Sequence, residues 1–205
     1  MLGLFGARGT GKTVAALRYL KAARPARLIV WDFKHDPTLA GLGQPVTELP
    51  ALIRAMARPR YQLRYLVDHD RDVAAQFDLF CRAAWLAGDL TMFVDEVPEV
   101  TKPGRAPAAW KKIVNVGRQY TRADGQVVGI TILGAGQRAA ECDKSFISNL
   151  DVVRAGRMGH EDDARALAKK IGCAWSELMT LPDLVYFERA ASDTTYVRGK
   201  LTFAK

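Results

Sequence analysis

The chain has 205 residues, of which 49% are hydrophobic and 25% are charged, the composition of a globular protein with one substantial core. We expect a single domain over residues 1–205, and no apolar run approaches the roughly 20 residues of a membrane-spanning helix, which excludes a membrane-embedded chain. Lys and Arg number 30 against 22 Asp and Glu, so the net charge of +8 favours a polyanionic partner without establishing one.

The cysteines and the N-terminus point to an intracellular protein. Cys81, Cys142 and Cys173 lie far apart, with no C-x-x-C pair and no adjacent His pair, so neither a zinc site nor a disulfide framework is indicated. An apolar strand that begins at Leu2 leaves no room for a signal peptide. We therefore expect a soluble protein with reduced, buried thiols.

The first informative stretch is an apolar strand that runs into a glycine-rich loop and then a helix. Residues 6–13 match the P-loop pattern G-x-x-x-x-G-K-[ST], and the strand before and helix after them disfavour a chance glycine-rich turn. Glycine permits dihedrals that turn successive N–H groups toward an anion. We expect Lys12 to neutralise the β and γ phosphates of ATP and the Thr13 hydroxyl to bind Mg²⁺. The predicted nucleotide-binding residues are Gly6, Ala7, Arg8, Gly9, Thr10, Gly11, Lys12 and Thr13.

The next elements are strands and helices of ordinary length. Hydrophobic patterns predict a buried strand at 27–33, with Asp32 at its carboxyl end, and a strand with one solvent-exposed face at 61–67. They also predict helices at 49–56 and 73–86. His35 and His69 have no partners at ligand spacing, and we interpret both as surface residues and not as catalysts.

A second informative stretch is the apolar strand at 90–96, which ends in Asp95 and Glu96, the form of a Walker B element. Asp95 is expected in the Mg²⁺ shell, and Glu96 is expected to accept the proton of an attacking water. Two solvated loop acids are the alternative, since such pairs are common, but the P-loop favours the Walker B interpretation. A kinase must keep water from the γ phosphate, whereas an aspartate followed by a glutamate base suits hydrolysis.

Basic residues follow this strand. Residues 97–107 are rich in Pro and Gly and are predicted to form a loop, and residues 108–120 a helix. Two interpretations stay open, a solvated basic helix face or contacts with DNA phosphates, with an Arg reaching a neighbour's nucleotide. The candidate DNA-binding residues are Lys102, Arg105, Lys111 and Lys112.

A buried strand predicted at 127–135 leaves Gln137 just beyond its end. Ligands bind beyond the carboxyl ends of strands in open α/β sheets, so Gln137 is expected beside the P-loop and the Asp95–Glu96 pair. A neutral amide there can orient water and report on the γ phosphate. The remaining predicted elements are a helical turn at 145–150, a strand at 151–157, helices at 161–171 and 175–178, and a terminal hairpin of strands 184–189 and 195–203.

The order of these motifs carries a family resemblance. A P-loop, the Walker B strand with its glutamate, a helix with Gly117 and Arg118, the strand ending at Gln137, and the segment 143–151 together resemble the FtsK-HerA superfamily of DNA-pumping ATPases over nearly the whole chain. The small size and the lack of an extra N-terminal domain are most similar to the genome-packaging ATPases of double-jelly-roll viruses with an internal membrane.

The resemblance implies an α/β fold, a P-loop NTPase of the additional-strand, catalytic-glutamate (RecA-like) type with a mainly parallel sheet flanked by helices and a C-terminal β-hairpin. It also implies ATP and Mg²⁺ as cofactors, a ring that is usually a hexamer, double-stranded DNA as cargo, and viral capsid or membrane vertex proteins as partners. Such a protein acts in the host cytoplasm during assembly or at the packaging vertex of the virion. By position Glu96 is the water-activating base, Gln137 the sensor and Arg118 the arginine finger given to a neighbour, with Arg122 and Arg138 as alternatives.

Other functions stay open. A small-molecule or nucleotide kinase shares the size and the P-loop, and a slowly hydrolysing assembly factor is a further alternative. A filamentous-phage-type assembly ATPase would have a membrane span after the core, and residues 201–205 offer none. Chromosome translocases carry membrane spans and a winged-helix domain that do not fit in this chain, and no Asn-Lys-x-Asp sequence indicates a GTPase. The size of the ring and the direction of movement are not determined by the sequence.

Overall fold

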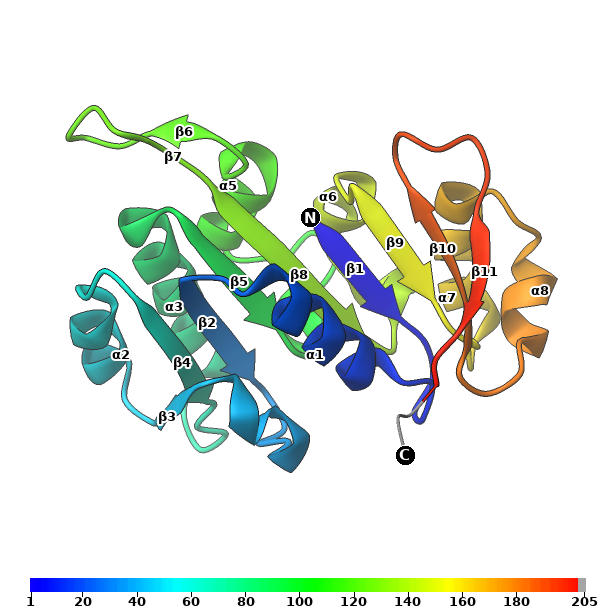
Figure 1. The fold of residues 1–205 in the computed structure, drawn as a ribbon, viewed down its shortest axis with the longest axis horizontal. Helices are drawn as coiled ribbons and strands as arrows, with labels where there is room; N and C mark the ends of the chain where they lie inside the picture. The colour runs from blue at the N-terminus through cyan, green and yellow to red at the C-terminus, as the bar shows by residue number, and fades with distance from the viewer. Residues whose placement is uncertain (203–205) are drawn as a thin grey trace.

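The computed structural model describes residues 1–202, so Phe203, the end of the last predicted strand, lies outside the described residues. A twisted nine-stranded sheet runs through the molecule in the order β11-β10-β9-β1-β8-β5-β2-β4-β3 (Figure 1). Neighbours from β9 to β3 are parallel, and β10 and β11 form an antiparallel hairpin at one edge. The strands of this sheet are β1 (Leu2–Phe5), β2 (Arg27–Asp32), β3 (Gln44–Val46), β4 (Tyr61–Leu66), β5 (Leu90–Val94), β8 (Ile130–Gly136), β9 (Val152–Ala155), β10 (Val185–Ala190) and β11 (Val197–Lys200).

The position of β8 decides the class of the sheet. β8 pairs in parallel with β1 on one side and with β5 on the other, so it separates the P-loop strand from the strand that ends in the acidic pair. An extra strand between these two is the feature that the additional-strand class requires. The predicted fold class, its mainly parallel sheet and its C-terminal hairpin are confirmed.

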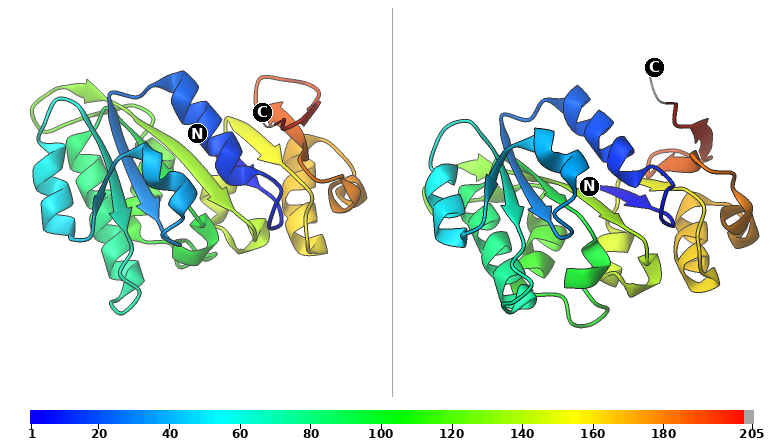
Figure 2. Two further views of the ribbon diagram at one scale, coloured as in Figure 1. Left: turned by 60° about the horizontal axis from the view of Figure 1, so that its bottom comes forward. Right: turned by 90° about the horizontal axis from the view of Figure 1, so that it is seen from below.

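Helices cover both faces of the sheet, as expected for parallel strands that are buried on both sides. α1 (Lys12–Ala23) and the short 3₁₀ helix η1 (Pro37–Leu42) lie on one face, and the other helices lie on the opposite face (Figure 2). The helices of that second face are α2 (Leu49–Met56), α3 (Val73–Ala87), α4 (Val97–Val100), α5 (Ala108–Val116), α6 (Lys144–Ser148), α7 (Glu161–Ile171) and α8 (Trp175–Thr180), with the 3₁₀ helix η2 (Ala139–Glu141).

Aromatic side chains fill the core between the sheet and the second helical layer. Trp31 of β2 lies 5.0 Å from Phe77 and 5.3 Å from Phe80, both on α3, measured between ring centroids. All three are fully buried, and each such side chain contributes roughly 1.5–3 kcal/mol through removal of apolar surface from water. This packing fixes β2, and with it the loop that follows, against α3.

Three predicted elements differ from the structure. The segment predicted as a loop at 97–107 begins with α4, because Pro98 is favourable in the first turn of a helix. The predicted helix at 108–120 ends at Val116, after which the chain forms a two-stranded hairpin of β6 (Tyr120–Thr121) and β7 (Val127–Val128). The predicted strand at 127–135 is interrupted at Gly129, whose N–H donates to Asp89 Oδ1.

The described part of the chain contains neither a disulfide bond nor a membrane-spanning helix. Cys81 and Cys142 are buried, Cys173 is half-buried, and none of them forms a disulfide with another residue in 1–202. No helix within residues 1–202 has the length and apolarity needed to cross a membrane.

Candidate active site

The predicted site residues meet at one edge of the sheet. β1, β8, β5 and β2 are parallel neighbours, so their carboxyl ends lie side by side. The P-loop follows β1, the Asp95–Glu96 pair follows β5, and Gln137 follows β8. Ligands of open α/β sheets bind at such an edge.

The P-loop has the backbone of a phosphate cradle. Gly6, Gly9 and Gly11 have φ angles of 151°, 82° and 86°, which side chains rarely allow. A Cβ on Gly6 would lie 2.6 Å from Thr10 Oγ1, so the loop also lacks room for a larger residue there. Lys12 Nζ donates to Gly6 O at 2.8 Å and to Ala7 O at 3.0 Å, which holds the ammonium group over the loop.

Both carboxylates are buried, and the side chain of Glu96 is held by its neighbours. Gln137 Nε2 donates to Glu96 Oε1 at 3.0 Å, and Lys34 Nζ forms an ion pair with the same oxygen. Within residues 1–202 no hydrogen bond reaches Glu96 Oε2. Glu96 thus has one anchored oxygen and one oxygen that is available to accept a proton from water.

The local sequence explains how Glu96 reaches this position. Glu96 has the left-handed backbone conformation, with φ 54° and ψ 56°, which costs a non-glycine residue roughly 1–2 kcal/mol. The strain is offset by the packing of α4 directly on β8. This packing needs glycine on the strand: a Cβ on Gly136 would lie 2.6 Å from Pro98 Cδ, and a Cβ on Gly134 would lie 2.8 Å from Val97 Cγ2. The two glycines make room for the helix that turns Glu96 inward.

The charges of the site influence one another strongly. Burial, followed by the adjacent Glu96 carboxylate, raises the pKa of Asp95 to about 7. Burial also lowers the pKa of the Lys12 ammonium group, and the charge of Glu96 opposes that change. Two adjacent buried carboxylates and a half-buried lysine indicate a site that is built for charged ligands.

Sequence reasoning missed Lys34. β2 pairs with β5, and Asp95 N–H donates to Trp31 O at 3.0 Å, so the loop after β2 runs beside the carboxylates. Asp32 orders this loop, because its buried carboxylate accepts from Asp36 N–H and pairs with Arg64 Nη1, each at 3.0 Å. The available signal was a polar loop, residues 34–37, at the carboxyl end of a predicted strand, but the sequence did not indicate that this strand lies next to the Walker B strand.

The residues present fit a magnesium nucleotide. The glycine cradle, the Lys12 ammonium group and the positive N-terminal end of α1 suit a polyphosphate. Asp95 and the Thr13 hydroxyl supply oxygen ligands of the kind that Mg²⁺ takes. Burial and then repulsion from Glu96 raise the pKa of Asp95, and a divalent cation would favour the charged form of this carboxylate. Among residues 1–202 no group of three or more His, Cys, Asp and Glu could hold a metal ion.

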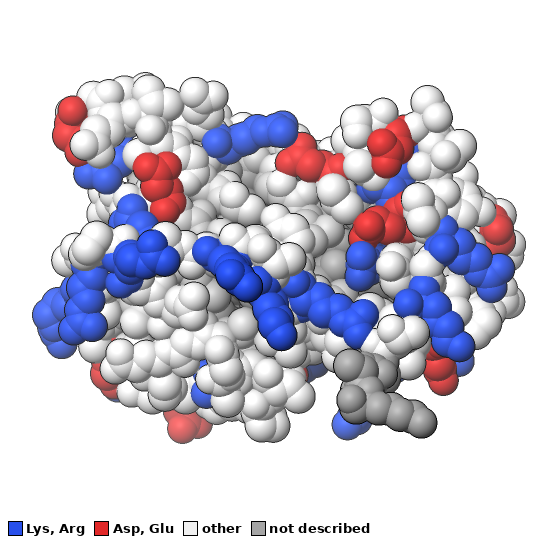
Figure 3. Space-filling model, viewed as in Figure 1, with Lys and Arg blue, Asp and Glu red and all other residues white. Residues whose placement is uncertain are grey.

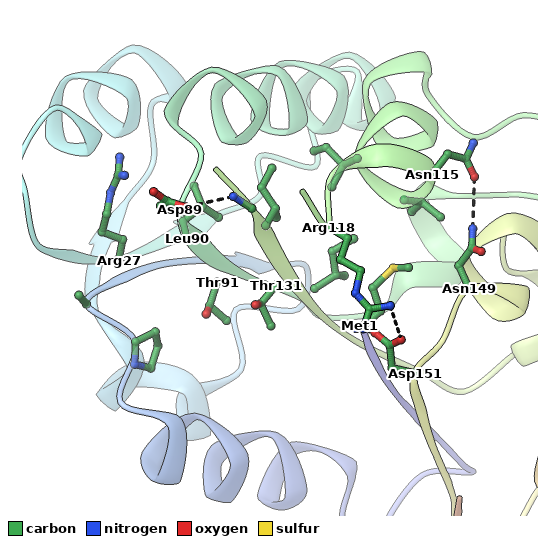
Figure 4. A pocket seen from close by; sticks show the side chains of 17 residues that line it. Met1, Arg27, Asp89, Leu90, Thr91, Asn115, Arg118, Thr131, Asn149 and Asp151 are labelled. Atoms are coloured by element: carbon green, nitrogen blue, oxygen red, sulfur yellow. Dashed lines mark hydrogen bonds and ion pairs between the residues drawn. The ribbon is translucent and has the colours of Figure 1, made fainter. Parts of the chain in front are cut away.

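The three arginines considered as fingers lie in different places. Arg118 is at the amino end of the parallel strands, beside a cavity of about 700 Å³, where it pairs with Asp151 at 3.1 Å (Figure 4). Its side chain is 83% exposed. Arg122 pairs with Asp124 and is 32% exposed, and Arg138 pairs with Asp163 and Glu141 and is 41% exposed. Arg118 therefore lies at the edge of the sheet opposite to the P-loop of its own chain.

The four candidate DNA-binding residues do not form one free surface. Lys102 Nζ pairs with Glu141 at 2.9 Å, and Arg105 is exposed in the loop after α4. Lys112 lies on α5 with its Nζ 4.1 Å from the ring centroid of Trp85, and Lys111 is half-buried. Two of the four cations thus already have partners within the chain.

The P-loop and the position of β8 between β1 and β5 identify the fold as that of a P-loop NTPase of the additional-strand type. Solved structures with this fold include the genome-packaging NTPase B204 of Sulfolobus turreted icosahedral virus 2 in complex with sulfate, at 17% identity and a TM-score of 0.76 over 100% of this chain and 98% of that one. B204 is also known in complex with AMPPCP, ATP-γS and AMP. The bacterial conjugative coupling protein TrwBΔN70 matches at 11% identity and a TM-score of 0.70, over 100% of this chain and 85% of that chain.

Similarity in sequence is more distant. Protein P9 of Pseudoalteromonas phage PM2 is 21% identical over 183 residues, which are 87% of this chain and 78% of that protein. No known family profile matches the sequence. The neighbours confirm, at the level of the fold, the resemblance that the sequence indicated.

Proposed function

We propose that this protein is an ATP-hydrolysing DNA translocase that packages a double-stranded viral genome into a preformed capsid. The observation that carries the proposal is the position of Glu96. It is a buried carboxylate next to a Walker B aspartate, anchored through Oε1 by Gln137 and Lys34, with Oε2 available to a water molecule. The resemblance of the fold to a genome-packaging NTPase and to a conjugative coupling protein supports DNA as the cargo.

Each residue of the site has a role in the proposed hydrolysis. The P-loop amides and Lys12 bind the phosphates of ATP, and Thr13 with Asp95 holds Mg²⁺, which neutralises the charge of the phosphate oxygens when bound. Glu96 accepts the proton of the attacking water. Gln137 holds Glu96 and orients that water from the end of β8.

The active form is proposed to be a hexameric ring, in which each subunit gives Arg118 to the nucleotide of its neighbour. Two features support Arg118 over its alternatives: it is the most exposed of the three arginines, and it lies opposite to its own P-loop. Arg138 is tied to the buried carboxylate of Asp163 at 2.9 Å, which makes it a support for the chain segment after Gln137. An arginine finger makes hydrolysis depend on assembly.

The proposed place of action follows from the resemblance and the cargo. Packaging takes place at the vertex of a procapsid in the host cytoplasm, so the expected partners are capsid or membrane vertex proteins and double-stranded DNA. The ATPase is then expected at the packaging vertex during assembly.

Three measurements on the purified chain test the proposal. Phosphate release from ATP is expected to rise when double-stranded DNA is added, and the mass of the protein with ATP and DNA is expected to be that of a ring. Displacement of an oligonucleotide bound in triplex to the duplex then reports movement. ATP-dependent phosphorylation of a small molecule, with no effect of DNA, would instead identify a kinase, and hydrolysis without displacement would identify an assembly factor.

A further inference from the structure

The positive charge of the chain is concentrated in two stretches that contain no acidic residue. Residues 2–31 and 49–67 hold ten of the 30 Lys and Arg residues and none of the 22 Asp and Glu residues. These stretches lie side by side, because β2 pairs with β4, with Arg27 opposite Tyr61, and Tyr61 N–H donates to Ala26 O at 3.0 Å. The turns that precede the two strands are therefore neighbours at the amino end of the sheet.

Five exposed cations of these stretches form a surface that we call the basic band: Arg18, Lys21, Arg24, Arg58 and Arg60. The first two are three residues apart on the exposed side of α1, Arg24 ends that helix, and the last two lie in the turn between α2 and β4. Within residues 1–202 none of the five forms an ion pair with a carboxylate. Figure 3 shows Lys and Arg side chains in a row across the face that carries α1, with no Asp or Glu between them.

Two further guanidinium groups lie behind the band. Arg27 Nη2 and Arg122 Nη1 both donate to Ala87 O, at 3.5 Å and 3.2 Å, so they converge at the end of α3. Arg27 also lies over the ring of Tyr61, with its Cζ 5.2 Å from the ring centroid. Two carboxylates also lie at this edge: Asp124 pairs with Arg122, and Asp89 lines the same cavity as Arg27. The excess of positive charge therefore comes from the band itself.

The basic band differs from a typical protein–protein interface. Protein interfaces centre on aromatic or other large anchors that fill pockets. The exposed residues between the cations of the band are Ala22, Ala23 and Pro59, which are small, and Tyr19, which is 38% exposed. One partly exposed ring does not form the cluster of anchors that such interfaces use. The dipole of a helix C-terminus favours one nearby cation at the end of α1 and of α2, but five cations without a carboxylate exceed that requirement.

We infer that the basic band binds the phosphate backbone of double-stranded DNA. Arginine predominates in it, and guanidinium groups match phosphate oxygens in charge and in geometry. Contacts of this kind carry no base information, which suits a protein that moves along any sequence. The inference rests on the proposed function for its choice of DNA as the polyanion, and it places the main phosphate contacts on α1 and the α2–β4 turn instead of on Lys102, Arg105, Lys111 and Lys112.

Two triple variants with the same loss of charge test the inference. The band variant carries Arg24→Gln, Arg58→Gln and Arg60→Gln, and the matched control carries Lys102→Gln, Arg105→Gln and Lys111→Gln. Binding of a fluorescent 30-base-pair duplex is measured for the full-length protein over a series of NaCl concentrations, with melting temperatures to confirm that both variants fold. Each lost phosphate contact lowers the slope of log K against log salt by about 0.9, so the band variant is expected to lose about 2.7 from the slope and the control less than 1.

The outcomes separate the two proposals. A band variant with a reduced slope beside a control with a wild-type slope supports the inference. The reverse result overturns it and leaves the translocase proposal intact. A wild-type protein that binds no duplex at any salt concentration overturns both. A band variant that binds DNA normally but no longer binds an acidic polypeptide such as polyglutamate also overturns the inference, in favour of a protein partner.

Discussion

The two ends of the parallel strands have opposite physical character. At the carboxyl end, Asp95 and Glu96 are buried, and Glu96 has a strained backbone and an anchored side chain. At the amino end, Arg24, Arg58 and Arg118 are exposed, and the first two have no carboxylate partner in the described chain. Chemistry on a phosphate requires groups that are removed from water and fixed in advance, whereas a long polyanion is held by exposed charges that adapt to it. The predictions below test this division from the largest expected effect to the smallest.

The largest effect is expected at the amino end, where Arg118 is proposed to act on a neighbour. Arg118→Ala is expected to lower the rate of hydrolysis by roughly 10³ to 10⁵, the range for P-loop enzymes that use an arginine finger, with ATP binding unchanged. Phosphate release from rings of mixed wild-type and variant subunits should fall more than in proportion to the variant fraction. A simple dilution curve, or an equal loss in Arg122→Ala or Arg138→Ala, would assign the finger elsewhere.

The next largest effect is expected from replacing the proposed base at the carboxyl end of the strands. Glu96→Gln is expected to lower turnover by roughly 10² to 10⁴ while ATP still binds, because an amide cannot accept the proton of the attacking water. Glu99→Gln is the matched control, since Glu99 is exposed on α4 only three residues further on. Turnover that survives in the Glu96 variant, measured as phosphate release at saturating ATP, would remove the base assignment.

Lys34 is expected to have a smaller effect. Its ion pair with Glu96 Oε1 positions the base, and a hydrogen bond between charged groups contributes about 1.5–3 kcal/mol, or about 10- to 100-fold in rate. Lys34→Ala should therefore lower kcat by that factor with little change in KM, and Lys34→Arg should restore most of it. Lys169→Ala, an exposed lysine on α7, serves as control. A change in KM alone would mean that Lys34 binds ATP instead.

The smallest effect concerns stability. The pKa of Asp95 is raised from 3.8 to about 7, so the folded protein holds a proton that the unfolded chain has lost between these values. The stability from this proton is complete below about pH 4 and is lost as the pH rises through 7. Asn has no proton to lose, so the free energy of unfolding of Asp95→Asn relative to wild type should rise by about 2.6 kcal/mol from pH 5 to pH 8. Urea unfolding without Mg²⁺ or nucleotide measures the difference, and a constant difference would contradict the raised pKa.

Local sequence determined the chemical groups of the site. The P-loop at residues 6–13, the apolar strand before Asp95 and Glu96, and the position of Gln137 after β8 all follow from patterns that span a few residues, because one strand end or one turn creates each of them. The carboxyl ends of parallel strands lie at one edge of a sheet, and this rule predicted that the three elements lie side by side there. The strands themselves were identified from continuous apolar runs.

Only the tertiary structure decided the rest, since it depends on strand order. β2 is next to β5, and this brings Lys34 to Glu96 across 62 positions of sequence. β2 is also next to β4, and this joins two acid-free stretches into the basic band. Single-stretch patterns carry no information on which strand lies beside which, and the left-handed turn at Glu96 depends on space left by Gly134 and Gly136 on another strand. The sequence by itself therefore determined which chemical groups the site contains, and the packing of the sheet decided which groups hold them in place.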